Sequence, residues 1–137
     1  MLFTKINSPY SRDININSYL IDWNKSPSKE QQVLQDFLKP YWKNKVILAE
    51  FMIPGSRFRV DLMNITDRIA IEYSPSSTHD FNKFFHVHPA MFKKRVKSDL
   101  DKIKWLQKNN FQVLEVVKDD LIHLSPSFFL SKFGIQL

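Results

Sequence analysis

The chain has 137 residues, no cysteine and a formal net charge of +6. This length suffices for one domain with a real hydrophobic core, and the lack of cysteine excludes disulfides and thiolate zinc sites. No apolar run is long enough to span a membrane and no secretory signal is visible, so we expect a cytoplasmic protein of a bacterium or a phage-infected cell. The positive charge favours nucleic acid as partner, although charge also serves solubility alone.

The N-terminal quarter predicts an arm followed by a helix. Residues 1 to 27 are irregular and rich in Asn and Ser, which favours short local structure. Ser28, with Gln31 three residues later, has the pattern of a capping box and predicts a helix start. Pro40 is expected to end or kink this helix. Its apolar stripe consists of Val33, Leu34, Phe37 and Leu38.

Three strands are predicted next, as a meander. Residues 46 to 53 form a nearly continuous apolar strand, and Pro54-Gly55-Ser56 supply a turn. Further strands are expected near residues 57 to 63 and 68 to 74. The turn residues 64 to 67 between them include Asn and Asp, which favour a tight connection.

The second and third of these strands each carry one acid. Side chains alternate along a strand, so Val60 and Leu62 share one face and Asp61 lies on the other. In the next strand Glu72 alternates with Ile71 in the same way. Because a tight turn joins the strands, the two carboxylates are predicted to converge on one divalent metal ion.

A long amphipathic helix and a final strand complete the predicted domain. The helix is expected from about residue 90 to 108, and the strand from 111 to 117, followed by one or two short helices. Asn109 and Asn110 can end the helix in a left-handed cap. The order of helix, three strands, helix and strand predicts an α/β fold with a mixed central sheet. The core stripe of the helix is predicted to be Phe92, Val96, Leu100, Ile103 and Leu106.

The stretch IEYSPSSTH places His79 seven residues after Glu72. With this spacing and the αβββαβ order, the chain resembles the PD-(D/E)XK nuclease superfamily. The branch that it resembles most contains very-short-patch-repair endonucleases and related phage and intron homing endonucleases. The resemblance covers roughly residues 28 to 120 and implies a restriction-endonuclease-like core within a single domain, with residues 121 to 137 as a tail.

The resemblance also implies roles for single residues. Glu30 matches the family's glutamate on the first helix, and Asp99 matches an aspartate on the second. The family's signature lysine, two residues after the strand glutamate, is replaced here by Ser74. His79 can substitute for it, or the protein does not cleave. Lys102 is a third candidate if its face of the helix points inward, because it lies one turn from Asp99.

Phosphodiester hydrolysis explains why these residue types would gather. Mg²⁺, or Mn²⁺ in its place, binds carboxylate oxygens and keeps several waters, so Asp61 and Glu72 are the predicted metal ligands. His79 is the predicted general base, because its pKa is ordinarily near neutral. Glu30 and Asp99 would orient water, metal or histidine.

Basic residues near the predicted site are candidate contacts to DNA phosphates. Arg59 shares the face of Asp61, and Lys102 lies on the long helix. The others surround the junction of the preceding loop and this helix, and they are Lys83, Lys93, Lys94, Arg95 and Lys97. A lysine-rich helix face can equally be a solvated face.

Each of the acids also has a structural explanation. Asp61 and Glu72 can be surface acids paired with arginines across the sheet. Glu30 can simply favour the helix dipole, and Asp99 can form ion pairs along its helix. Glu50 lies in an apolar strand and can approach the site from the next strand, or pair with a buried arginine.

The sequence therefore predicts a magnesium-dependent endonuclease acting on double-stranded DNA, of homing or mobile-element type, with a phage as a candidate source. A homodimer would give one active site for each strand. A monomeric repair enzyme that nicks one strand is the first alternative. The second is a nucleic-acid-binding module with the same fold and no catalysis.

Overall fold

The computed structural model describes residues 1–75 and 89–137, and for residues 89–98 it describes the backbone alone. The fold is α/β, as predicted, and contains the αβββαβ order. The central sheet has the strand order β3-β4-β5-β6, in which only β5 and β6 run parallel. The elements are β1 (Leu2–Thr4), β2 (Ser11–Asp13), η1 (Ile16–Tyr19), α1 (Lys29–Trp42), β3 (Ile47–Met52), β4 (Arg59–Asn64), β5 (Ile69–Ser74), α3 (Pro89–Lys108), β6 (Gln112–Val117), η2 (Lys118–His123) and α4 (Pro126–Phe133).

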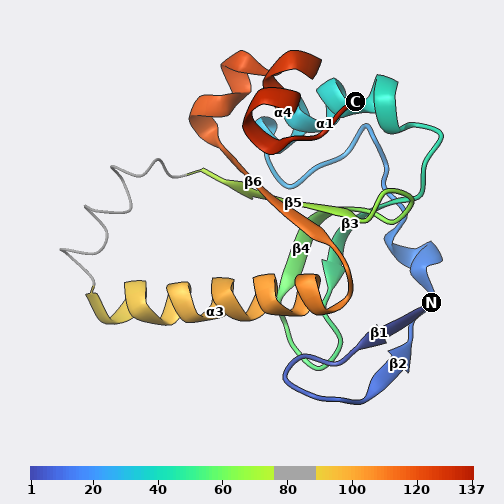
Figure 1. The fold of residues 1–137 in the computed structure, drawn as a ribbon, viewed down its shortest axis with the longest axis vertical. Helices are drawn as coiled ribbons and strands as arrows, with labels where there is room; N and C mark the ends of the chain where they lie inside the picture. Colours follow the sequence, from blue (N-terminus) through green and yellow to red (C-terminus); the bar gives the residue numbers. More distant parts are fainter. Residues whose placement is uncertain (76–88) are drawn as a thin grey trace.

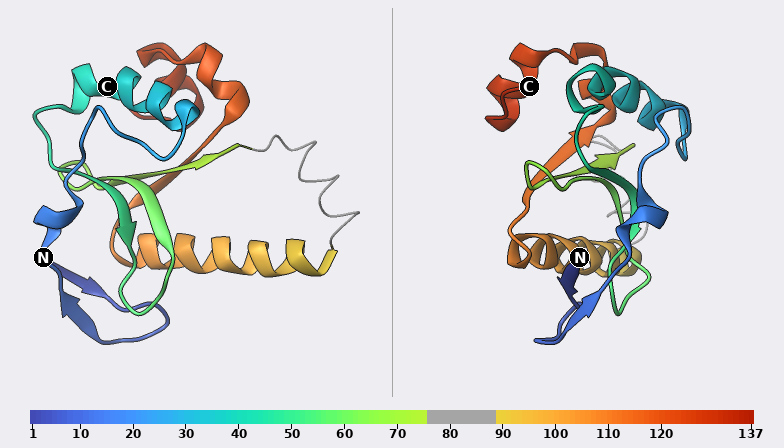
Figure 2. Two further views of the ribbon diagram at one scale, coloured as in Figure 1. Left: turned by 180° about the vertical axis from the view of Figure 1, so that it is seen from behind. Right: turned by 90° about the vertical axis from the view of Figure 1, so that its right-hand side faces the viewer.

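Helices cover both faces of the central sheet. The helix α3 runs along one face, while α1 and α4 lie on the other (Figure 1). The view along α3 in Figure 2 shows the same three layers from the side. Each interface has its own group of buried apolar side chains. The α1 side buries Leu34, Leu38, Trp42, Leu62, Ile71, Leu114 and Phe129. The α3 side buries Phe3, Leu48, Phe51, Met63, Ala70, Trp105, Leu106 and Phe111.

The helix α1 begins as the sequence predicts but does not end at Pro40. The Ser28 hydroxyl accepts a hydrogen bond from the Gln31 N–H at 3.1 Å. The helix then continues through Pro40 to Trp42. Proline removes one backbone donor, but the Lys43 N–H still bonds the Lys39 carbonyl at 2.9 Å. The continued turn buries the Trp42 ring, which is 1% exposed, and this burial favours the longer helix.

Local turn chemistry sets the ends of the strands and of α3. In the β4–β5 turn, the Asn64 carboxamide accepts from the Asp67 N–H at 2.8 Å and donates to its carboxylate at 2.9 Å. Gly55 has φ +81° in the β3–β4 turn, a value that costs glycine little. Asn110 has φ +67°, so the predicted left-handed cap after α3 is confirmed.

The predicted core stripe of α3 is wrong at Leu100, which is 50% exposed. Trp105 and Leu106 are buried against the sheet, and Lys102 lines a cavity on the same side of the helix. The inward face therefore runs through positions 102, 105 and 106, which leaves Leu100 turned outward. The side chains of Phe92 and Val96 lie outside the described part of the chain.

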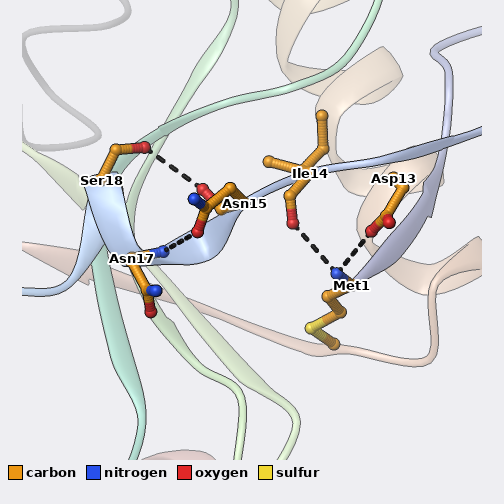
Figure 3. Close-up of polar contacts among 6 residues, drawn as sticks. All are labelled: Met1, Asp13, Ile14, Asn15, Asn17 and Ser18. Carbon is orange, nitrogen blue, oxygen red and sulfur yellow. Dashed lines mark hydrogen bonds and ion pairs between the residues drawn. The ribbon is translucent and has the colours of Figure 1, made fainter.

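The N-terminal segment has the short local structure that was expected, and it is anchored to the domain. Phe3 is 1% exposed and packs in the α3-side core. The Met1 amino group donates to Asp13 Oδ1 at 2.8 Å and to the Ile14 carbonyl at 3.0 Å, which ties β1 to β2 (Figure 3). Figure 3 also shows Asn15 capping the first turn of η1.

The C-terminal segment packs on the opposite side. Phe129 of α4 is fully buried in the α1-side core. No helix within the described ranges has the length and apolarity needed to cross a membrane.

Candidate active site

Two neighbouring levels of the central sheet have opposite chemistry. The register aligns Leu48 with Met63, Met63 with Ala70, and Ala70 with Val113. We call these four residues the apolar row. All four pack in the α3-side core.

Each of the four strands carries an acid two residues away from its member of the apolar row, on the same side of that row. Glu72 pairs directly with Glu115. The pairing of Leu62 with Ile71, extended by one residue, sets Asp61 opposite Glu72. Glu50 stands opposite Asp61, because the pairs on either side of it are Ala49–Leu62 and Phe51–Val60. We call the four residues that share this level, Glu50, Asp61, Glu72 and Glu115, the acidic row.

The partly buried carboxyls of Asp61 and Glu72 form the centre of this row. Asp61 Oδ2 accepts a hydrogen bond from the Tyr73 N–H at 2.8 Å, which fixes its carboxyl against β5. One oxygen of Glu72, Oε1, is buried and has no hydrogen-bond donor among the described residues. The neighbouring Asp61 carboxyl can bond to Glu72 only when one of the two acids holds a proton. The predicted convergence of these two side chains is present.

Lys102 reaches this pair from α3. Its Nζ lies 3.3 Å from Glu72 Oε2 and 2.9 Å from the Arg59 carbonyl oxygen. The side chains of Lys102 and Glu72 are 20% and 21% exposed, so the ion pair is largely shielded from water. Lys102 therefore points from α3 toward the sheet, which was the condition for its predicted part in the site.

Burial makes both acids weaker, and the charge of Asp61 adds to this effect at Glu72. Burial raises the pKa of Glu72 to about 8, with a further contribution from the charge of Asp61, while Lys102 opposes the shift. Burial also raises the pKa of Asp61, against the Tyr73 N–H and Lys102. An additional positive charge placed between these carboxyls would relieve both effects.

A cavity of about 250 Å³ opens beside the pair. It lies between the ends of β5 and β6 and the middle of α3, and it has room for a hydrated ion and a phosphate group. Its polar lining consists of Asp61, Glu72, Ser74, Asp99, Lys102 and Glu115.

The donor set fits a hard divalent cation. The two acids offer carboxylate oxygens, and Glu72 Oε1 lacks any donor in the described structure. Among the residues that the structure describes, no group of three or more His, Asp or Glu side chains is arranged to hold a metal ion. Two carboxylates are nevertheless a usual protein contribution for Mg²⁺, which keeps several waters and completes its shell with substrate phosphate.

The other predicted catalytic residues have different positions. Asp99 is exposed and lines the cavity. Glu30 does not line the cavity. Burial raises the pKa of the Tyr73 hydroxyl, and the charge of Glu30 raises it further. His79 lies outside the described residues.

The predicted DNA contacts are only partly described. Arg59 is exposed at the start of β4 and does not line the cavity, although its carbonyl oxygen accepts a hydrogen bond from Lys102, which does line it. Lys83 falls outside the described ranges, as do the side chains of Lys93, Lys94, Arg95 and Lys97.

Glu115 and Gln31 belong to this region although sequence reasoning did not select them as site residues. Glu115 has one signal in the sequence, because it is the only acid in the apolar stretch FQVLEVV. Gln31 is 4% exposed, and its side-chain amide donates to Glu50 Oε1 at 3.2 Å. In the sequence it was part of a predicted capping box, and its backbone N–H does donate to the hydroxyl of the N-cap Ser28.

Comparison of this chain with models of protein families, with curated proteins and with solved structures found no match.

Proposed function

We propose that this protein is a metal-dependent DNA endonuclease of the PD-(D/E)XK type, and that it is a homing or mobile-element enzyme. The observation that carries the proposal is the pair of partly buried carboxyls, Asp61 and Glu72, which adjoin each other and face Lys102 at a cavity. Two acids and one lysine are a suitable set for hydrolysing a phosphodiester. The net charge of +6 supports a polyanionic substrate.

Each residue has a distinct task in this proposal. Asp61 and Glu72 would hold Mg²⁺, which supplies Lewis acidity and a bound water of lowered pKa. The Tyr73 N–H keeps the Asp61 carboxyl in place. Lys102 would neutralise charge that develops on the phosphate, a task that Ser74 cannot perform because it has no charge.

The proposal also covers proton transfer and the cleavage of the two DNA strands. His79 is our candidate for the group that takes the proton of the attacking water. Asp99, at the mouth of the cavity, is placed to orient water. Cleavage of both strands would use a homodimer, since one site cuts one strand at a time.

Plasmid cleavage tests the proposal directly. Supercoiled DNA is incubated with Mg²⁺ and either the wild type or Asp61→Asn, which keeps the shape of the side chain and removes its charge. We expect Asp61→Asn to lower the cleavage rate by about 10³-fold, because the principal metal ligand is lost. Asp36→Asn makes the same charge change at an exposed position of α1 and should cleave like the wild type. Equal loss in both variants, or none in either, would contradict the site.

The products separate the remaining alternatives. Linear DNA supports cleavage of both strands, and nicked circles support a repair-type enzyme. Salt-sensitive binding without cleavage would support the non-catalytic module, which the serine at position 74 favours. Lys102→Met tests the lysine, because it keeps the aliphatic stem and removes the charge. We expect cleavage to fall about tenfold to a hundredfold while Mn²⁺ binding persists.

A further inference from the structure

Glu50 has a backbone conformation that is unusual for its residue type. Its φ is +52°, in the left-handed region, within the strand β3. Glutamate rarely adopts this region, and such conformations persist where the surrounding structure enforces them, often at functional sites. Glu50 is therefore held in place by its neighbours rather than by its own preference.

The unusual conformation coincides with a change in the direction of side chains along β3. Before it, Ile47 and Ala49 pack on the α1 side and Leu48 packs on the α3 side. After it, Phe51 packs on the α3 side, where regular alternation from Leu48 would not place it. The alternation is interrupted at Glu50, which therefore need not project with the other acids of its row.

The side chain of Glu50 is bound by the helix of the other layer. Gln31 of α1 is 4% exposed, and its amide donates to Glu50 Oε1 at 3.2 Å. A buried amide needs a partner, so this bond restrains both side chains. Glu50 does not line the cavity, which excludes it from the residues that would touch the ion directly.

Glu50 nevertheless acts on the carboxylate pair through space. It stands opposite Asp61 in the sheet, and the two carboxyls repel each other electrostatically. Its charge also interacts with Arg59 and Lys102, which are positive groups at the same site. A fixed negative charge behind Asp61 strengthens the attraction of the site for a cation without adding a ligand.

We propose that Glu50, oriented by Gln31, is a positioning residue of the site and that it acts through Asp61 to raise the affinity for a divalent cation. This inference rests on the proposed function, because it requires that the pair of acids binds such an ion. In this proposal the hydrogen bond between Gln31 and Glu50 connects α1 to the site through β3.

The test measures binding of Mn²⁺ alone to the full chain, by electron paramagnetic resonance of the free ion. We expect Glu50→Gln to weaken Mn²⁺ binding about tenfold, since one charge near the ion is lost. Plasmid cleavage at saturating Mg²⁺ should stay within about twofold of the wild type, because the ligands remain. Gln31→Met should weaken binding in the same direction by a smaller factor, and Asp36→Asn should leave it unchanged.

Glu50→Gly separates positioning from a merely structural role. Glycine adopts positive φ readily, and this relief offsets the cost of leaving the buried Gln31 amide without its partner, so the variant should melt close to the wild-type temperature while it binds Mn²⁺ more weakly. A lower melting temperature with unchanged Mn²⁺ affinity would overturn the inference. So would a loss of cleavage in Glu50→Gln that saturating Mg²⁺ does not restore, because that result identifies a direct ligand.

The two proposals fail in different ways. If the wild type binds no Mn²⁺, the proposed cation site fails and this inference fails with it. If the wild type binds Mn²⁺ and Glu50→Gln binds it equally well, the inference alone is overturned.

Discussion

The apolar row and the acidic row cross the same four strands only two residues apart, yet the first is closely packed against α3 and the second borders a cavity. Leu48, Met63, Ala70 and Val113 lie under the last turns of α3, where Trp105 and Leu106 exclude water. At the acidic row α3 presents Lys102 to the carboxyls, with Asp99 and Ile103 also lining the cavity that remains between helix and sheet. Close packing of α3 on the sheet is therefore found at the apolar row and gives way to a cavity at the acidic row.

The difference indicates what each row contributes to the protein. Apolar neighbours across strands stabilise a sheet, whereas like charges directly opposite each other destabilise it. Four acids at one level are therefore costly to the free protein, and such violations of packing rules are expected at functional sites. A cation bound at the acidic row would convert this local repulsion into attraction.

Truncating the apolar row gives the largest expected change in stability. Met63 is fully buried, so Met63→Ala removes packed atoms and leaves a cavity. We expect a loss of about 3 kcal/mol in the free energy of unfolding, measured by urea denaturation. Glu72→Gln, in the same sheet but in the acidic row, should cause no loss at pH 8 without metal. Equal destabilisation by both variants would show that the two rows do not differ.

The pH dependence of stability probes the acidic row itself. The pKa of Glu72 is raised to about 8 in the folded protein, against 4.5 as its ordinary value. The folded state thus retains a proton that the unfolded chain releases. Without metal, stability should fall as pH rises from about 5 to about 8, by roughly 3 to 4 kcal/mol from this group, since one pKa unit corresponds to about 1.4 kcal/mol.

Glu72→Gln provides the control, since glutamine does not titrate. The difference in unfolding free energy between the wild type and this variant should change across that pH interval, while contributions from other groups cancel. Saturating Mg²⁺ should reduce the slope in the wild type, because the ion binds the deprotonated carboxylates. A pH-independent difference between the two proteins would argue against a shifted carboxyl.

Sequence reasoning was most successful where periodicity carries the information. Alternation in two strands predicted that Asp61 and Glu72 converge, although Val60 and Leu62, expected on one face of the sheet, pack in different cores. The order of elements predicted the α/β sheet. Pro40 does not end the helix, which was one of the two outcomes expected there, because burial of Trp42 is a tertiary effect. Leu100 was misassigned because the inward stripe of α3 includes a lysine, which a search for apolar residues does not select.

The remaining part of the site depends on features that sequence patterns do not encode. Neighbours on a helix differ by about 100° in direction, and it is Gln31 rather than Glu30 that faces β3. The left-handed backbone conformation at position 50 is not indicated by the sequence, because the residue there is a glutamate and not a glycine or asparagine, which adopt this conformation more readily. Glu115 joins the row only through the parallel pairing of β5 with β6, which links residues 43 positions apart (115 minus 72).

The smallest effect is expected at the outer end of the acidic row. Glu115 pairs with Glu72 and lines the cavity, but it is exposed to water, where charges interact weakly. We expect Glu115→Gln to weaken Mn²⁺ binding by no more than about twofold, and less at high salt. The same charge change at Glu50 should have a clearly larger effect, because Gln31 fixes that carboxylate in a partly buried position. If Glu115→Gln weakens binding more than Glu50→Gln does, the ion lies toward β6, and the site is built around Glu72 and Glu115 rather than around Asp61.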